Sequence, residues 1–433
     1  MRNKIIPAFL LALFLSACGG EPPPPSYGAN PELPEPERGL LPSMVISMPA
    51  EWGDQKPTVP QGYSVEMIAD DLSVPRQTLV LPNGDILVAE GSGGSAPVMR
   101  PKDMIANYVK KQGKTDRPGG NRLTLLRDAD GDGRYELKTT FAENVNAPYG
   151  MALIGDSLYV ANQDAVVRFE YQDGQTRASG PPEKIVDLPS VYNHHWTKAM
   201  AASVDGRYLY VGIGSNSNIT ERGMEVEEDR AMVWQIDPQT RMHRRYATGL
   251  RNPSALAVDP DTNQLWVAVN ERDEIGDNLV PDYLTAVRDG GFYGWPYSYW
   301  GRNVDERAQP QRSDLVERAI TPDYSLGAHV AALGLAFSTP AMGERFAEGV
   351  FVGEHGSWNR KVPVGFKVVF VPFRNGRPTG AAPVDFVTGF LNEDGDARGR
   401  PVGVSVDPRG ALIVADDLAN VIWRVTPTDR AAR

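Results

Sequence analysis

Residues 251–270 of the chain read RNPSALAVDPDTNQLWVAVN, and this stretch contains the pattern from which the fold follows. A proline opens a run of small and apolar residues, a turn rich in Asp and Asn follows, and the run LWVAV comes after the turn. Short apolar runs on either side of such a turn are typical of a β-hairpin. We therefore expect two antiparallel strands in this stretch.

The same pattern occurs six times along the chain. Most copies have short β-branched runs of period two around an Asn-Gly, Asp-Gly or Arg-Gly turn. The six copies cover residues 74–91, 147–164, 195–214, 251–270, 330–356 and 400–417. Further strands are expected downstream, at residues 122–128, 165–171, 231–237, 366–373 and 420–427.

A unit of about four strands cannot bury its own faces. Six such units therefore predict an all-β fold, a six-bladed β-propeller around a central channel. The copies begin between 48 residues apart (147 and 195) and 79 residues apart (251 and 330), so several blades must have long loop insertions. No long amphipathic helix is expected. Residues at the start of each copy should meet at one end of the channel.

The first residues of the chain resemble an export signal. Arg2 and Lys4 precede a short apolar run, and Leu15, Ser16, Ala17 and Cys18 resemble the bacterial lipobox, in which the cysteine is lipidated. We expect a lipoprotein signal peptide over residues 1–18, a Pro-rich flexible tether over 19–57 and the propeller domain over 58–429. A secreted protein with an incidental cysteine is the alternative.

These ends predict a location for the protein. We expect a lipid-anchored lipoprotein of the bacterial cell envelope that faces the periplasm and contacts the membrane only through the anchor. Because Cys18 is the only cysteine, the chain cannot form an internal disulfide. The formal net charge of −11 argues against nucleic acid as a partner, since phosphate binding would be opposed by the overall field.

Despite the acidic total, basic and imidazole side chains gather at the start of the six copies. They include Arg76, Tyr149, His194, His195, Arg251, Asn252, His329, Arg398 and Arg400. In a propeller these residues would form a ring around one end of the channel, which suits an anionic ligand. Chance placement of the arginines remains the alternative.

Five segments in order point to a known family. They are the histidine segment 191–200, GLRNPSALAVDP (249–260), RDEIGDNL (272–279), RDGGFYGWPYSYWG (288–301) and GEHGSWNR (353–360). The chain resembles the pyrroloquinoline quinone (PQQ) dependent sugar dehydrogenases of the glucose/sorbosone dehydrogenase type, most closely the L-sorbosone dehydrogenase-like members. The resemblance runs from about residue 62 to 427 and implies two cofactors, PQQ and calcium.

The resemblance also implies which residues contact PQQ. The cofactor has three carboxylates, which guanidinium groups bind bidentately. The matching positions are Arg251, Asn252, Arg398 and Arg400, together with one of Arg360 and Lys361. Arg251 would also polarise the quinone carbonyl that receives the hydride. The family's glutamine in the second unit has no clean match, since Asn146 and Tyr149 stand in that region.

The pair His194 and His195 raises the question of which histidine is the general base. Successive residues at a strand entrance point in opposite directions, so we expect only one of the two to face the channel axis. His195 matches the position of the family's catalytic base, which would take the proton of the sugar hydroxyl. His194 would pack beside it.

Two acidic segments are candidate calcium sites. The resemblance places metal ligands around Glu274 and Tyr293, partly through backbone carbonyls. Separately, Asp128, Asp130 and Asp132 form the first half of an EF-hand-like loop. Thr139 stands where the bidentate glutamate of such a loop is expected, so the sequence favours a plain structural turn here, with calcium binding as the alternative.

Together these observations predict an enzyme. It would oxidise an aldose or a sorbosone-like sugar, with hydride transfer from the anomeric carbon to PQQ and a histidine base; the electron acceptor is open. A calcium-dependent propeller lactonase or hydrolase is one alternative, which would need carboxylates from several blades at the axis. A non-catalytic propeller that serves as a binding platform is the other.

Overall fold

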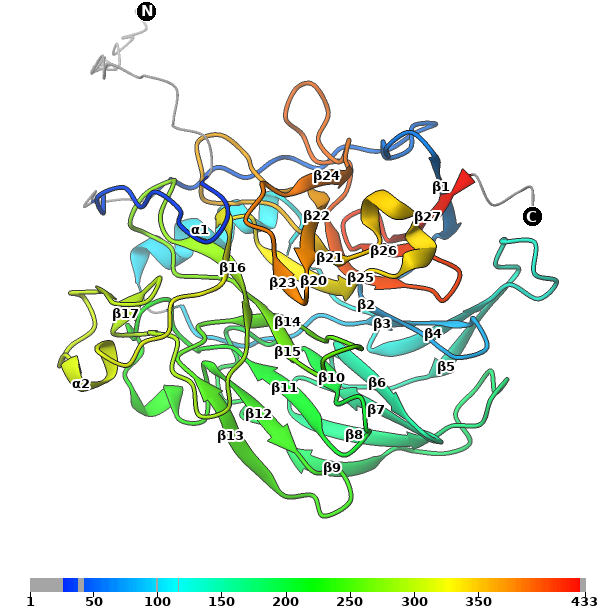
Figure 1. Cartoon of the computed structure of the whole chain (residues 1–433), viewed down its shortest axis with the longest axis horizontal. Coiled ribbons are helices and arrows are strands. Elements are labelled where there is room, and N and C mark those ends of the chain that lie inside the picture. The colour runs from blue at the N-terminus through cyan, green and yellow to red at the C-terminus, as the bar shows by residue number, and fades with distance from the viewer. Residues whose placement is uncertain (1–25, 38–42, 99, 116, 429–433) are drawn as a thin grey trace, which may run out of the picture.

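The computed structural model describes residues 26–37, 43–98, 100–115 and 117–428 (Figure 1). Its main feature is six antiparallel sheets, mostly of four strands, arranged around a channel. The prediction of an all-β, six-bladed propeller is confirmed.

The first three blades contain these strands, given from the innermost outward. The first blade has β2 (Pro75–Val80), β3 (Ile86–Glu90), β4 (Arg122–Arg127) and β5 (Leu137–Ala142). The second has β6 (Gly150–Ile154), β7 (Ser157–Ala161), β8 (Ala165–Glu170) and β9 (Glu183–Asp187). The third has β10 (Met200–Ala202), β11 (Leu209–Ile213), β12 (Met232–Ile236) and β13 (His243–Thr248).

The other three blades follow the same plan with additions. The fourth has β14 (Pro253–Val258), β15 (Leu265–Val269), β16 (Pro281–Ala286) and β19 (Tyr324–Ala328). The fifth has β20 (Ala332–Phe337), β21 (Gly349–Glu354), β22 (Lys367–Arg374) and β23 (Arg377–Pro378), and β24 (Val384–Val387) pairs with β22. The sixth has β25 (Pro401–Val406), β26 (Leu412–Asp416), β27 (Val421–Pro427) and β1 (Tyr63–Ala69).

The remaining elements lie in connections between strands. They are the helices α1 (Pro101–Gln112) and α2 (Ser313–Val316), the small hairpin of β17 (Ser298–Tyr299) and β18 (Asn303–Val304), and 3-10 turns at Glu225–Glu227, Pro340–Met342 and Glu344–Phe346. The helix α1 was not expected from the sequence. Within the described ranges, no helix combines the length and the apolar character needed to cross a bilayer.

Both ends of the described chain build the sixth blade. Strand β1 pairs with β27 in antiparallel register, with Tyr63 opposite Pro427. The innermost strands β2, β6, β10, β14, β20 and β25 each contact the next one around the ring, and β25 contacts β2. The pairing of the first strand with the last sheet therefore closes the ring.

The core consists of six apolar clusters, one between each pair of neighbouring blades. Trp266 of the fourth blade, for example, packs in one cluster with Val350 and Val369 of the fifth. Because both faces of each sheet are covered, the second strands of most blades are buried along their whole length. This packing fixes the relative positions of the loops at the channel end.

The N-terminal segment differs from the prediction of a flexible tether over 19–57. Its described part packs on the propeller: Gly28 and Ser325 exchange backbone hydrogen bonds of 3.2 and 2.8 Å, and the Ala50 amide donates to the Ala397 carbonyl at 2.7 Å. Composition indicates that such a segment cannot fold alone, but the blades supply its partners. The expected signal peptide, residues 1–18 with Cys18, lies outside the described residues.

Candidate functional site

We call the end of the channel at which the six innermost strands begin the mouth. Its floor is the side chain of Tyr149, which is fully buried. The Tyr149 hydroxyl lies 3.2 Å from the carbonyl oxygen of Ser254 and 3.1 Å from that of Leu333, so the ring reaches from the second blade to the fourth and fifth. Gln77 also donates to Leu333, at 2.8 Å. These contacts close the channel below the mouth.

Below this floor the channel widens into a cavity of about 380 Å³, lined by all six innermost strands. Its lining beyond the floor is largely small and apolar. Above the floor the character changes to charged and imidazole side chains. The chemistry of the protein is therefore concentrated at the mouth.

Arg76 lies directly on this floor. Its guanidinium carbon is 5.6 Å from the centre of the Tyr149 ring and 5.5 Å from that of Trp196. It forms an ion pair with Asp417, and Nε2 of His355 lies 3.0 Å from Oδ1 of the same carboxylate. Burial alone would raise the pKa of Asp417, but His355 and Arg76 hold it well below its usual range. Asp417 is therefore ionised and links the first, fifth and sixth blades.

His194 and His195 precede β10 by several residues and lie in a loop, not in a strand. Strand alternation therefore does not separate them: their ring centres are 4.7 Å apart and the rings meet edge to face. We expected strand alternation to turn only one of them toward the axis, and that reasoning was wrong because neither histidine lies in a strand. What distinguishes the two rings is hydrogen bonding.

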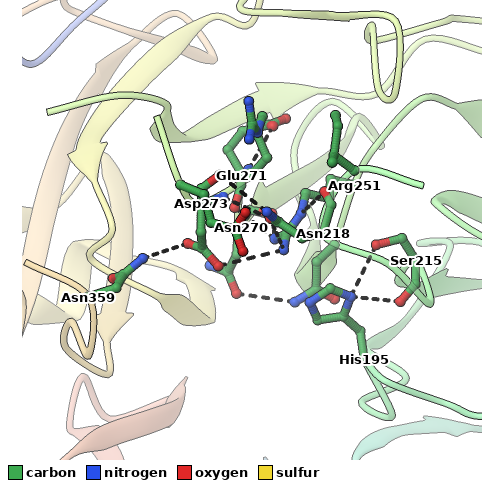
Figure 2. Close-up of polar contacts among 12 residues, drawn as sticks. His195, Ser215, Asn218, Arg251, Asn270, Glu271, Asp273 and Asn359 are labelled. Atoms are coloured by element: carbon green, nitrogen blue, oxygen red, sulfur yellow. Dashed lines mark hydrogen bonds and ion pairs between the residues drawn. The ribbon is translucent and has the colours of Figure 1, made fainter. Parts of the chain in front are cut away.

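Nδ1 of His195 lies 2.7 Å from the carbonyl oxygen of Ser215 (Figure 2). A carbonyl can only accept, so Nδ1 carries the proton and Nε2 of the neutral ring keeps its lone pair. Burial, and then the Arg251 cation, lowers the pKa of His195 well below its ordinary value. The ring is therefore a neutral base at neutral pH.

Asn252 and His195 pack on either side of Gly214, which has no side chain and so leaves room for both. A Cβ on Gly214 would clash with the side-chain oxygen of Asn252 and with Cβ of His195. The side-chain nitrogen Nδ2 of Asn252 donates to Oδ1 of Asn270 at 3.3 Å. Its own Oδ1 is buried and has no hydrogen-bond partner among the described residues. The mouth thus holds an unpaired acceptor next to the base.

The buried guanidinium of Arg251 donates to protein oxygens on three sides (Figure 2). Nη1 donates to the carbonyls of Asn270 (3.1 Å) and Glu271 (2.7 Å). Nε and Nη2 donate to the backbone and side-chain oxygens of Asn218, at 3.2 and 3.1 Å. Nη2 also faces Oδ2 of Asp273 at 3.8 Å. Arg251 therefore ties the third blade to the fourth.

Asp273 completes this side of the mouth. Its Oδ1 accepts from Nδ2 of Asn359 at 2.8 Å (Figure 2). The same oxygen lies 3.3 Å from Nδ1 of His329. Although burial opposes it, His329 and Arg251 keep the pKa of Asp273 well below its usual range. His329 also donates from Nε2 to the Gly276 carbonyl at 2.9 Å, and its pKa is raised by Asp273 against the effect of burial.

The other expected PQQ contacts are dispersed. Arg400 is buried: its Nη2 lies 3.4 Å from the Ser47 carbonyl, and its Nε has no acceptor among the described residues. Arg398 instead lines a cavity of about 570 Å³ beside Trp52, and its contacts to Gly389 and Leu391 are long, at 3.5 Å.

The loop after β21 turns two of its residues toward the mouth and two away from it. Asn359 contacts Asp273 and His329, and Trp358 lies under the Lys110 ammonium. Arg360 is buried, and its Nε and Nη1 have no hydrogen-bond partner among the described residues. Burial lowers the pKa of Arg360, an effect that Asp277 partly offsets. Lys361 is exposed, and its backbone amide donates to Asp277 at 3.0 Å.

Two contributors to the mouth were missed from the sequence. Lys110 comes from α1, and the sequence showed no periodic signal that would identify this helix. Asn218 lies in a loop of the third blade, outside the six copies, and contacts Arg251 and Asp273 through its side chain. Only the packing of the loops reveals either residue.

The acidic loop of the first blade brings four carboxylates together. Ligand atoms of Asp128, Asp130, Asp132 and Glu136 all lie within 4.8 Å of one another. Glu136 was missed because a glutamate was expected at position 139. The loop joins β4 and β5 at the end where Leu126 lies opposite Ile86, which is the end of the blade away from the mouth.

The other expected metal ligands lie elsewhere. Glu274 is on the rim of the mouth, where its carboxylate pairs with Lys102 and lies 3.6 Å from Arg100. Tyr293 is buried in the core, and its hydroxyl donates to the Ala286 carbonyl at 2.7 Å. Burial raises the pKa of Tyr293 to about 12, so the ring stays protonated.

Comparisons with known proteins agree with this architecture. A family model described as TrAA12-like matches residues 115–283 and 302–428. An uncharacterized protein of Borreliella burgdorferi is 24% identical over 383 residues, which cover 85% of this chain and 90% of the relative. Aldose sugar dehydrogenase YliI of Escherichia coli is 22% identical over 204 residues, which cover 42% of this chain and 52% of the relative.

Solved structures share the fold. The calcium structure of a Trichoderma reesei family AA12 enzyme has a TM-score of 0.69 at 19% identity, covering 86% of this chain and 97% of that one. The holo PQQ domain of pyranose dehydrogenase from Coprinopsis cinerea has a TM-score of 0.68 at 20% identity, with the same coverage. The apo aldose sugar dehydrogenase of E. coli has a TM-score of 0.57 at 17% identity, covering 84% and 99%.

Proposed function

Because the chain belongs to the TrAA12-like family, we propose that it is a PQQ-dependent sugar dehydrogenase that oxidises an aldose or a sorbosone-like sugar at its anomeric carbon. The observation on which this proposal depends is the orientation of His195, whose Nδ1 is hydrogen-bonded to Ser215 so that Nε2 is free to act as a base. The named sugar dehydrogenases of the same fold support it.

The mouth has the donors and acceptors that suit PQQ. Within the described part of the chain, Arg400 and Arg76 each have a buried Nε without an acceptor, and the side-chain oxygen of Asn252 lacks a donor. Buried polar atoms without partners are costly, so a ligand that pairs with them is expected to bind. A tricarboxylate with ring carbonyls offers partners for the guanidinium nitrogens. When bound, PQQ would supply the acceptor for the hydride that leaves the sugar.

The residues of this chain would prepare the sugar for that transfer. Nε2 of His195 takes the proton of the anomeric hydroxyl while the Ser215 carbonyl keeps the ring in the required tautomer. Burial, together with the charge of Arg251, lowers the pKa of His195 and keeps the ring neutral before the sugar binds. Through its bonds to Asn218, Asn270 and Glu271, Arg251 also positions the loops of the third and fourth blades.

The direct test is reconstitution of the purified protein. We expect PQQ added with calcium to show quinone absorbance that bleaches when an aldose or sorbosone is supplied. A His195→Asn variant should bind PQQ but bleach it far more slowly than the wild type does. Failure of the wild-type protein to bind PQQ would refute the proposal, and binding without bleaching by any aldose or sorbosone would refute the substrate class.

The alternative of a metal-dependent hydrolase has little support in the site. Such an enzyme would need several His or carboxylate ligands at the channel axis. Over the described ranges, the one group of three or more such residues with converging ligand atoms is Asp128, Asp130, Asp132 and Glu136, at the far end of the first blade. A binding platform would not be expected to have a base oriented as His195 is.

We propose that calcium binds this acidic loop and stabilises the first blade there. Carboxylate oxygens are the ligands that calcium prefers. Calcium should raise the thermal midpoint of the wild-type protein and should have no effect on an Asp130→Asn, Asp132→Asn double variant. The same increase in both proteins would refute this assignment and would direct attention to Glu274 and Tyr293.

We further propose that the protein is attached to the bacterial cell envelope through a lipid on Cys18 and faces the periplasm. The sequence around Leu15–Cys18 supports this proposal. A Cys18→Ser variant should leave the membrane fraction. If that variant still sediments with membranes, another surface holds the protein there and the anchor assignment is wrong.

A further inference from the structure

Helix α1 lies over the mouth. It belongs to the long insertion between β3 and β4 of the first blade and precedes the residues matched by the family model. At its N-terminal end, Lys102 pairs with Glu274, and Arg100 lies 3.6 Å from both Glu274 and Glu221. These glutamates belong to loops of the third and fourth blades. The start of α1 is therefore fixed to the opposite rim of the mouth.

The C-terminal end of α1 is fixed to the sixth blade. Gly113, which follows the helix, is buried against the side chain of Ile46 from the N-terminal segment. A Cβ on Gly113 would lie 3.0 Å from Nη2 of Arg400, so the backbone passes close to this arginine. The helix thus spans the mouth between two attachment points.

Between these points, Lys110 extends toward the mouth. Its ammonium lies 4.1 Å from the centre of the Trp358 ring, on the fifth blade. Among the described residues, no carboxylate lies within ion-pair distance of it; Asp273 and Arg251 are among the groups that act on it through their charge. Burial lowers the pKa of Lys110 from its ordinary value. The ammonium therefore has donors that the protein leaves unused.

Three other cations near the mouth already pair with protein groups. Arg251 donates to Asn218, Asn270 and Glu271, and Arg76 pairs with Asp417. Arg222 donates to the Asn216 carbonyl and pairs with Glu221. Like the Nε groups of Arg76 and Arg400, Lys110 thus has donors for an anion that enters from outside, and it is the one of the three that α1 contributes.

We propose that Lys110 binds a carboxylate of the ligand in the mouth and that α1 covers this ligand. Under the proposed function the ligand is PQQ, so this inference depends on that function. A charged hydrogen bond from an ammonium to a carboxylate is stronger than a neutral one. The indole of Trp358 holds the ammonium in place through a cation–π contact. The helix thereby adds a binding group from outside the six repeated units.

The chain offers a matched control for a binding test. Lys111 is adjacent on α1 but exposed to solvent, so Lys110→Gln and Lys111→Gln remove the same charge from the two sides of the helix. We expect Lys110→Gln to weaken PQQ binding about 10-fold to 100-fold, measured by quinone absorbance without substrate. Lys111→Gln should bind as the wild type does, and Lys110→Arg should recover most of the affinity.

A second measurement follows the cover itself. Hydrogen exchange of the α1 amides should slow when PQQ binds to the wild-type protein and should change less in Lys110→Gln. Equal PQQ affinity in the wild type and Lys110→Gln, or equal losses in the Lys110 and Lys111 variants, would overturn the inference. If the wild type binds no PQQ at all, the proposed function fails instead, so the two failures are distinguishable.

Discussion

Nδ1 of His195 and the carbonyl oxygen of Ser215 are 2.7 Å apart, and this contact determines which ring nitrogen can act as a base. His195 lies in the loop before β10, and Ser215 follows β11 of the same blade. The hydroxyl of Ser215 lies 3.2 Å from the same nitrogen. Both contacts hold the proton on Nδ1 and leave Nε2 for the substrate.

Loss of the base should slow turnover without releasing the cofactor. Replacement of His195 by Asn should lower kcat by about 10²–10⁴-fold, the usual contribution of a positioned base. PQQ affinity should change little, because the ring is proposed to contact the sugar. The His194→Asn control should lose much less. If the control is the slower of the two, the roles of the histidines are exchanged.

The acidic limb of the pH–rate profile should lie below pH 6.5. Burial, with the Arg251 cation, lowers the pKa of His195 from 6.5, so the ring stays neutral and active in mildly acidic solution. As the pH falls through the lowered pKa, protonation removes the lone pair and kcat/KM decreases. An acidic limb above pH 6.5 that disappears in His195→Asn would contradict this assignment.

Activity should require a glycine at position 214, because a side chain there would clash with both Asn252 and His195. The Gly214→Ala variant must displace one of these side chains, which we expect to lower kcat at least 10-fold and to cost about 1–3 kcal/mol of folding free energy. The matched control is Gly180→Ala, since a Cβ on Gly180 would meet nothing within 4 Å. Wild-type kinetics in Gly214→Ala would show that the pair can rearrange freely.

The buried carboxyl of Glu354 should make stability depend on pH. It ends β21 at 1% exposure, neither oxygen has a hydrogen-bond partner among the described residues, and burial raises its pKa from 4.5 to about 8. The folded state therefore favours the protonated form. The contribution of this carboxyl to the free energy of unfolding should be greatest below pH 4.5 and should fall up to pH 8, by at most about 1.4 kcal/mol per pH unit.

Urea unfolding at pH 5 and pH 8 tests this expectation. The Glu354→Gln variant cannot ionise at this position, so its free energy of unfolding should fall less between the two pH values than that of the wild type. Parallel pH dependence in the two proteins would show that Glu354 is not protonated in the folded state.

The repeated hairpins were sufficient to predict the six blades, because period-two runs around turns are local signals. The last strand of the ring was not assigned, since β1 (Tyr63–Ala69) has no turn that links it to β27. The order of residues 43–57 was also missed. Trp52 packs against Phe390 and Trp423, contacts that exist only after the blades have formed.

The site followed from the sequence where a residue lies shortly before an innermost strand: Arg251 and Asn252 directly precede β14, and His195 lies in the loop before β10. Arg398 and Arg400 are two residues apart and of one type, yet it is Arg400 that lies close to Gly113 at the end of α1, while Arg398 lines a cavity beside Trp52. Lys110 lies in the insertion between β3 and β4. The sequence shows how long this insertion is, but it does not show where the insertion runs on the propeller. Side-chain directions in loops depend on tertiary contacts, which a single sequence does not specify.

The pairing of Tyr63 with Pro427 also constrains when this protein can finish folding. The sixth sheet needs strands from both ends of the propeller, so the ring cannot close until almost the whole domain has left the ribosome. Closing so long a loop has an entropic cost, and folds rich in such distant contacts form slowly. Until then, β1 has no partner strand and its exposed edges can pair with another chain. A nascent chain is therefore exposed to misassembly until β1 and β27 meet.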